Sequence, residues 1–189
     1  MRISGAGWAA HRAASSPGIY GFEHGAEGWS RGGGCTAARQ SGDQSKSGQF
    51  SLALGMALGP AERQGEAWVD LRQSRPAGVS DVPVNLGGRT VTAWVYAPRG
   101  ARGDAERPNG FQLFVKDAEW RATYGAWQNV VEERWVRLSL AVGGARAPSG
   151  FVAAGFDPSR VIAVGVKFGL GADPTAKFEQ TVYLDAVDW

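Results

Sequence analysis

The chain has 189 residues, enough for one domain, and 43% of them are hydrophobic, which is enough for a sizeable core. Its 20 Lys and Arg residues against 18 Asp and Glu give a net charge of +2, and the basic residues are scattered rather than gathered in a stripe. A single cysteine, Cys35, excludes an internal disulfide framework and a thiolate zinc site. Since there is also no long apolar run, we expect neither nucleic acid nor a membrane as a partner.

The first segment differs in composition from the rest. Residues 1–17 are rich in Ala, Ser and Gly and run into Ser15-Ser16-Pro17-Gly18, which predicts a linker or flexible arm. The predicted domain covers residues 18–189. The N-terminal residues lack the apolar core of a signal peptide, so any export signal is expected elsewhere.

From residue 18 onward, short β-prone runs alternate with loops that contain Pro and Gly, and no long segment has helical periodicity. The predicted strands are, in chain order, 18–23, 50–56, 67–71, 90–96, 110–116, 128–131, 135–141, 161–168 and 181–187. The pattern predicts an all-β protein.

Two of these strands alternate clearly between two faces. In 161–168 the predicted core-facing residues are Ile162, Val164, Val166 and Phe168. In 110–116 the predicted core-facing residues are Phe111, Leu113 and Val115, and the outward ones are Gln112, Phe114 and Lys116. This alternation is typical of a two-sheet antiparallel β-sandwich.

The strand 90–96 places a tryptophan opposite small aliphatic residues. Val91, Ala93 and Val95 are the better candidates for the core side, so Trp94 is expected to face outward. We expect it to share a sheet face with Gln112 and Lys167.

Two matching segments lie at opposite ends of the domain. Tyr20-Gly21-Phe22-Glu23 and Tyr183-Leu184-Asp185-Ala186-Val187 each place one carboxylate within an apolar, β-prone run. Burying such a charge is costly unless it is compensated. A shared cation would compensate both; two unrelated surface carboxylates, or pairing of Glu23 with a nearby Arg or Lys, are the alternatives.

The order of several segments resembles a known family. The segments are Phe22-Glu23 with Gly28-Trp29, then 45–52, then 92–98, and finally Val182-Tyr183-Leu184-Asp185. In this order they look like the β-jelly-roll carbohydrate-binding modules attached to bacterial polysaccharide-degrading enzymes. The middle stretch, from Phe114 to Trp135, is similar to modules found beside β-mannanases and β-glucanases, and the resemblance runs from about residue 19 to the C-terminus.

This resemblance implies a jelly-roll fold, a polysaccharide ligand with mannan or β-glucan favoured, a covalently attached glycoside hydrolase, and secretion. It also implies a structural calcium ion, which binds hard oxygen ligands in irregular geometry. Carried over to this sequence, the side-chain ligands would be Glu23 and Asp185. Gly21 and Lys46 would offer carbonyl oxygens, with the Lys46 charge turned to solvent.

Sugar binding needs aromatic rings for the apolar face of a pyranose and polar groups for its hydroxyls. The segment 120–129 supplies both, with Trp120, Tyr124 and Trp127 as platforms and Arg121, Gln128 and Asn129 as polar neighbours. Trp94, Gln112 and Lys167 are further candidates. Tryptophans in sandwiches also serve as core residues, and if this cluster is packing, the platform is expected at Trp94 or Trp68.

Catalysis is the main alternative to binding. The sequence holds only His11 and His24, which leaves little material for a Ser-His-Asp or Cys-His arrangement. Glycoside hydrolysis needs two carboxylates at a defined separation, and candidates exist in Asp117, Glu119, Glu132 and Glu133. We therefore predict a non-catalytic module; a glycoside hydrolase or polysaccharide lyase on the same fold, or a protein-interaction or adhesion domain, are the alternatives.

Overall fold

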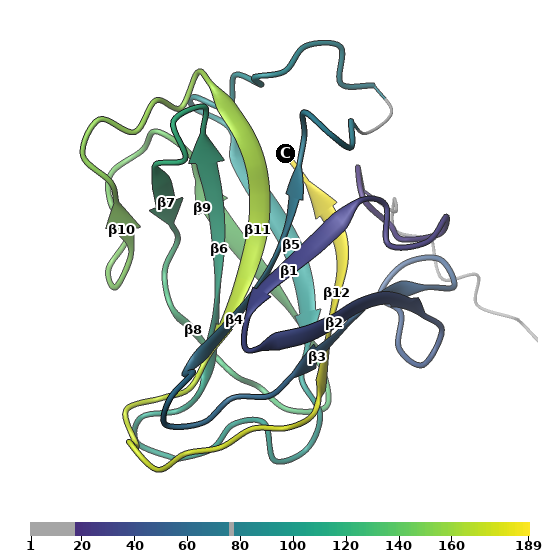
Figure 1. Ribbon diagram of the computed structural model, residues 1–189, viewed down its shortest axis with the longest axis vertical. Helices are drawn as coiled ribbons and strands as arrows, with labels where there is room; N and C mark the ends of the chain where they lie inside the picture. Colours follow the sequence, from purple (N-terminus) through teal and green to yellow (C-terminus); the bar gives the residue numbers. More distant parts are fainter. Residues whose placement is uncertain (1–17, 76–77) are drawn as a thin grey trace, which may run out of the picture.

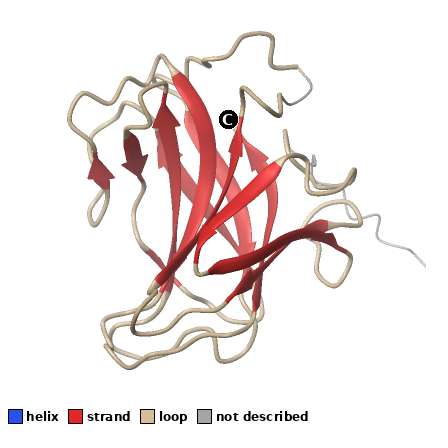
Figure 2. Cartoon of the chain, in the orientation of Figure 1, coloured by secondary structure: helices blue, strands red, loops and turns tan. Residues whose placement is uncertain are grey.

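The computed structural model describes residues 18–75 and 78–189. The predicted linker, 1–17, lies outside the described residues. Within the described ranges every regular element is a β-strand (Figure 2), and no helix there is long and apolar enough to cross a membrane. The strands are β1 (Trp29–Gly33), β2 (Cys35–Ser41), β3 (Ser51–Met56), β4 (Gln64–Asp70), β5 (Thr90–Tyr96), β6 (Gly110–Asp117), β7 (Ala122–Tyr124), β8 (Gln128–Asn129), β9 (Trp135–Ala141), β10 (Phe151–Val152), β11 (Val161–Gly169) and β12 (Thr181–Asp188).

The strands form two antiparallel sheets packed as a sandwich, which confirms the predicted fold class. The larger sheet has the order β1-β4-β11-β6-β7-β10, with β8 pairing to β6, and the smaller sheet has the order β2-β3-β12-β5-β9. In Figure 1, β6, β7, β10 and β11 of the larger sheet lie to the left, and β2, β3 and β12 of the smaller sheet lie to the right. Each sheet therefore has one face in the core and one facing outward.

The core follows the predicted alternation in β6 and in most of β11. Phe111, Leu113 and Val115 belong to the buried cluster, and the Phe111 and Phe168 rings contact each other at a centroid distance of 4.9 Å. Ile162 was predicted to face the core, and this prediction was wrong. A β-bulge between Val161 and Ala163 shifts the alternation, so that Val161 joins the core cluster in place of Ile162.

Most of the predicted strands match the structure, whereas segments 18–23 and 128–131 do not. Segment 18–23 forms only an isolated bridge between Tyr20 and Val187, because the chain turns at Phe22, where φ is 60°. Segment 128–131 is reduced to the two residues of β8. The sequence did not predict β1, β2, β7 or β10; three of them are the end strands of their sheets.

Candidate functional site

Aromatic side chains gather on the outward face of the larger sheet. Trp68 on β4, Gly165 on β11, Phe114 on β6 and Tyr124 on β7 are in register, so they form one row across four strands. Phe151 on β10 pairs with Tyr124 and extends the row to the sheet edge, with 54% of its surface exposed. We call this surface the aromatic face, defined by Trp68, Trp120, Tyr124 and Trp127; Phe114 lies in the same row but is fully buried.

Glycines beneath the rings allow them to lie low on the sheet. A Cβ at Gly169 would lie 3.0 Å from Trp127 Cη2, and one at Gly110 would overlap the same indole. A Cβ at Gly32 would lie 2.9 Å from Trp68 Cζ3, and one at Gly165 would overlap the Phe114 ring. These rings contact the backbone of the sheet directly, because glycine has no side chain to keep them away.

Trp120 is the most exposed ring of the set, with 44% of its surface accessible, and a buried carboxylate holds its turn. Asp117, fully buried, accepts hydrogen bonds from the backbone N–H of Glu119, Arg121 and Asp157 and from Arg121 Nε, at 2.9 to 3.0 Å. Burial opposes ionisation of Asp117, but these bonds keep its pKa below the usual value. The φ of 61° at Trp120 is thereby maintained, and the ring is presented on a fixed turn.

Charged side chains lie between the rings. Lys116 Nζ is 5.5, 5.1 and 5.3 Å from the ring centroids of Trp68, Phe114 and Trp120, and 3.9 Å from Glu66 Oε2. Glu66 Oε1 accepts a hydrogen bond of 2.9 Å from the Tyr124 hydroxyl. The face thus combines flat apolar surfaces with hydrogen-bonding groups, which are the two features that a sugar requires.

The pKa directions agree with this geometry. Burial, with the negative charge of Glu66, raises the pKa of the Tyr124 hydroxyl, so it stays protonated and donates to Glu66. Burial lowers the pKa of Lys167, against the opposing effect of Glu66. The Lys167 ammonium lies 4.6 Å above the centroid of the Tyr124 ring.

The predicted polar residues occupy mixed positions. Gln112 lies on the aromatic face as predicted, but it is 5% exposed and its amide donates to the Gly125 and Ser149 carbonyls at 2.9 and 3.1 Å. Arg121 is engaged by Asp117 and Glu119, with shortest distances of 2.9 and 2.8 Å. Gln128 is in register with the core-facing Phe111, so it projects away from the aromatic face.

Trp94 is on a different surface from the one predicted. Its outward orientation is confirmed, because Val91, Ala93 and Val95 are buried in the core cluster. However, β5 belongs to the smaller sheet, whereas Gln112 and Lys167 are on the larger one. Trp94 therefore lies on the opposite side of the sandwich, and its assignment to the same face was wrong.

Trp68 was predicted only as a fallback for the platform. It lies far from Tyr124 in the sequence and three strands away from it in the sheet order. The two residues share a face only because β4 pairs with β11 and β11 pairs with β6, the strand next to β7. The signal available in the sequence was its alternation with Ala67 and Val69, both fully buried.

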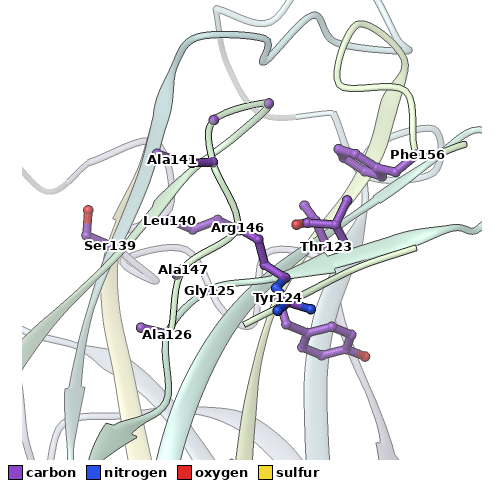
Figure 3. Close-up of a pocket in the computed structure, with 14 residues that line it drawn as sticks. Thr123, Tyr124, Gly125, Ala126, Ser139, Leu140, Ala141, Arg146, Ala147 and Phe156 are labelled. Atoms are coloured by element: carbon purple, nitrogen blue, oxygen red, sulfur yellow. The ribbon is translucent and has the colours of Figure 1, made fainter. Parts of the chain in front are cut away.

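A small cavity opens at the edge of the sandwich between β7 and β9. It has a volume of about 100 Å³ and is lined largely by small or apolar residues, among them Ala126, Leu140 and Phe156. In Figure 3 the Tyr124 ring lies on the opposite side of the cavity from Ser139. The described lining contains no carboxylate or imidazole.

The two matching carboxylates converge on one loop. Asp185 Oδ2 accepts hydrogen bonds from the backbone N–H of Lys46 and Ser47 at 2.7 and 2.9 Å, and Glu23 Oε1 accepts from Gln49 and Phe50 at 3.0 and 3.2 Å. Burial raises the pKa of the fully buried Asp185 to about 6, and the negative charge of Glu23 adds to this. The pair is therefore a place where a cation would relieve both desolvation and repulsion.

Lys46, whose charge was predicted to turn to solvent, is partly exposed and lies beside an aromatic ring. Its ammonium lies 4.2 Å from the centroid of the Trp94 ring. Within the described residues, 18–75 and 78–189, no group of three or more His, Cys, Asp and Glu side chains is arranged to hold a metal. A cation at Glu23 and Asp185 would thus need carbonyl oxygens to complete its shell, as the Gly21 and Lys46 assignment requires.

No protein-family model matches the sequence, and no curated protein is similar to it. Among solved structures, a carbohydrate-binding module from work on promiscuous specificity in the β-sandwich superfamily has a TM-score of 0.61 and 19% identity, covering 94% of this chain and 63% of that one. A CBM28 module specific for non-crystalline cellulose has a TM-score of 0.50 and 13% identity, covering 93% of each chain. The CBM22-1–GH10 modules of a Clostridium thermocellum endo-1,4-β-D-xylanase, in complex with xylohexaose, give a TM-score of 0.51 and 14% identity over 88% of this chain and 27% of that one.

These similarities show the fold: the chain adopts the β-sandwich that carbohydrate-binding modules also adopt. They confirm, at the level of the fold, the resemblance that the sequence motifs predicted. The chain spans 63% of the first of these structures.

Proposed function

We propose that this protein is a non-catalytic carbohydrate-binding module whose aromatic face binds a polysaccharide. The observation that carries the proposal is the set of partly exposed rings lying low over glycines, with charged and hydroxyl groups between them. An open sheet face with these groups can stack the apolar side of a sugar and hydrogen-bond its rim.

The dimensions favour a chain of several sugars. Trp68 and Tyr124 are separated by three strand spacings, about 14 Å. Along the strands, Trp127 lies at the level of Gly110, and Trp120 lies beyond the level of Lys116. At about 3.3 Å per residue, the face therefore extends about 20 Å in this direction. We propose a β-linked polysaccharide, with mannan or β-glucan favoured by the sequence resemblance; xylan and cellulose, named for the similar structures, belong in the same test.

Catalysis has less support, because the carboxylates considered for it have other partners. Glu132 accepts a hydrogen bond of 2.8 Å from the backbone N–H of Arg102, and Glu133 pairs with Arg99 at 3.2 Å. Asp117 is fully buried, and Glu119 pairs with Arg121 and Arg160 at 2.8 Å each. The proposed role is targeting: a tethered, secreted glycoside hydrolase gains effective concentration on its substrate.

Affinity electrophoresis against soluble mannans, β-glucans and xylans tests this proposal. The protein should be retarded by at least one of them, and Trp120→Ala and Trp127→Ala should weaken the retardation while leaving thermal unfolding nearly unchanged. Absence of retardation by every polysaccharide, or retardation of both variants equal to that of the parent, would contradict it.

We also propose a structural calcium ion at Glu23 and Asp185, with carbonyl oxygens of Gly21 and Lys46. The donors fit the ion, since calcium prefers carboxylate and carbonyl oxygens and tolerates ligands from distant segments. Such an ion would tie β12 to the loop before β3 and to the chain entering β1. Elemental analysis of the purified protein, and unfolding with and without a chelator, test this proposal.

A further inference from the structure

Most of the carboxylates on and beside the aromatic face are paired with arginines. Asp70 pairs with Arg72 at 2.7 Å, Asp117 with Arg121 at 2.9 Å, and Glu119 with Arg121 and Arg160 at 2.8 Å. The remaining carboxylate, Glu66, is 3.9 Å from Lys116. Among the described residues, Lys167 has no carboxylate of its own.

Lys167 occupies the centre of the face. It is in register with Glu66 on β4 and with Gln112 on β6, and its ammonium lies over the Tyr124 ring. Both oxygens of Glu66 have partners already: the Tyr124 hydroxyl at 2.9 Å and the Lys116 ammonium at 3.9 Å. Lys167 therefore shares the negative charge of Glu66 with Lys116.

The surroundings of Lys167 make its positive charge available to a ligand. No hydrogen bond or ion pair within the described chain engages the Lys167 ammonium, which lies over the π face of Tyr124. Burial lowers its pKa, which indicates that Glu66 does not fully compensate the loss of water around it. Because Lys167 is partly buried beside the Tyr124 ring, an incoming anion would interact with its ammonium more strongly than it would in bulk solvent.

Building on the proposed function, we propose that Lys167, assisted by Lys116, binds the carboxylate of a uronic acid residue, so that β-linked polysaccharides carrying uronic acids bind more tightly than the neutral mannan and β-glucan that the sequence resemblance favours. The uronate ring would stack on the aromatic face while its carboxylate accepts hydrogen bonds from the ammonium groups. No chemical step is involved, only recognition.

The test compares a polyuronate with the same polysaccharide after reduction of its carboxyl groups to alcohols. Chain length and linkage are then matched, and only the charge differs. The parent protein should bind the acidic form about tenfold more tightly at low ionic strength. The difference should shrink as salt is added, because the site is partly open to solvent and is screened.

Three variants locate the effect. Lys167→Met keeps the aliphatic stem and should lose most of the preference for the acidic form, whereas Lys167→Arg keeps the charge and should retain the preference. Lys177→Met removes one positive charge from an exposed loop position and should behave as the parent does. Circular dichroism and thermal unfolding establish that each variant is folded, and the Arg variant keeps the test decisive if the Met variant is not.

Two results would overturn the inference, and they can be told apart. Equal binding of the acidic and reduced polysaccharides by the parent removes the uronate proposal but leaves the carbohydrate-binding face standing. Failure of the parent to bind these or any neutral polysaccharide removes the proposed function and the inference together.

Discussion

The two outward faces of the sandwich both carry aromatic rings, but the rings are arranged differently. On the larger sheet, Trp68 and Trp127 lie low over glycines, and charged groups separate Trp68 from Trp120. On the smaller sheet, Tyr96 contacts Trp135 and Tyr183 at centroid distances of 5.7 and 6.0 Å, with tilted and edge-on geometries.

This difference in ring packing shows how one face of a sandwich can be more accessible to a ligand than the other. Rings that pack edge to face against one another cover part of each other's surface, and the ammonium of Lys46 covers Trp94. On the larger sheet, Lys116 and Arg72 also lie near Trp68 and Trp120, but at 5.3 to 5.5 Å from the ring centroids they are farther away than Lys46 is from Trp94. A count of exposed aromatic residues would not separate these two surfaces; what lies beneath and beside each ring does.

The largest predicted effect is on stability at the turn that presents Trp120. Asp117→Ala removes a fully buried carboxylate and leaves Arg121 and three backbone N–H groups without their acceptor. We expect a loss of about 3–5 kcal/mol in the free energy of unfolding, measured by denaturant titration. Asp43→Ala, at an exposed position near the smaller sheet, is the control and should cost less than about 0.5 kcal/mol. A loss below about 1 kcal/mol for Asp117→Ala would show that the turn does not depend on this carboxylate.

The second prediction concerns the carboxylate pair on the side of the smaller sheet. A cation that binds only the folded state stabilises it by about 2.7 kcal/mol at a concentration one hundred times its dissociation constant. Saturating calcium should therefore raise the melting temperature of the parent, and a chelator should lower it. Asp185→Asn should lose this response, whereas Lys167→Met, on the other face, should keep it. An unchanged melting temperature in the chelated parent, with no metal found by elemental analysis, would contradict the calcium proposal.

The same pair predicts a pH dependence in the presence of chelator. Because burial raises the pKa of Asp185 to about 6 from the usual 3.8, the folded state binds the proton more tightly than the unfolded state does. This contribution to stability is complete below about pH 4 and is lost as the pH rises through about 6, with a size on the order of 2 kcal/mol. Denaturant titrations of the chelated parent between these values should show stability falling with pH, and Asp185→Asn should flatten the curve. Stability of the chelated parent that rises steadily over this interval would contradict the assignment.

The smallest predicted effect concerns the space beneath a ring. Gly169→Ala places a Cβ 3.0 Å from Trp127 Cη2, so the indole must move outward. We expect a stability change of about 1 kcal/mol and a few-fold weaker polysaccharide binding. Gly42→Ala is the matched control, because its nearest contact would be 3.7 Å and its backbone does not need positive φ. Equal binding by the two variants would show that the height of Trp127 does not matter.

How far the sequence alone leads can be judged from particular strands. β5, inside the smaller sheet, and β9, at its end, were predicted with their observed bounds, because both sequences alternate between core and solvent. β1 and β10 are end strands of the larger sheet, and their short sequences, Trp29–Gly33 and Phe151–Val152, show little alternation. Their pairing is determined by neighbouring strands that are distant in the sequence.

The site was predictable to the same degree. Trp120, Tyr124 and Trp127 fall within one segment, so their association could be inferred from local sequence. Trp68 reaches the face only through sheet order, and Trp94 was placed on the wrong side because alternation shows that a residue faces outward but not from which sheet. Gln112 and Lys167 were correctly placed together, since β6 and β11 pair directly.

The most direct test of the account compares one tryptophan from each outward face. Trp68→Ala and Trp94→Ala remove the same side chain from the larger and the smaller sheet, and both parent residues are partly exposed. Dissociation constants for the best polysaccharide of the panel should be measured by isothermal titration calorimetry, on variants shown to be folded. The account predicts a loss of about 2 kcal/mol or more in binding free energy for Trp68→Ala and unchanged binding for Trp94→Ala. Unchanged binding by Trp68→Ala together with weakened binding by Trp94→Ala would place the ligand on the other face and contradict the account.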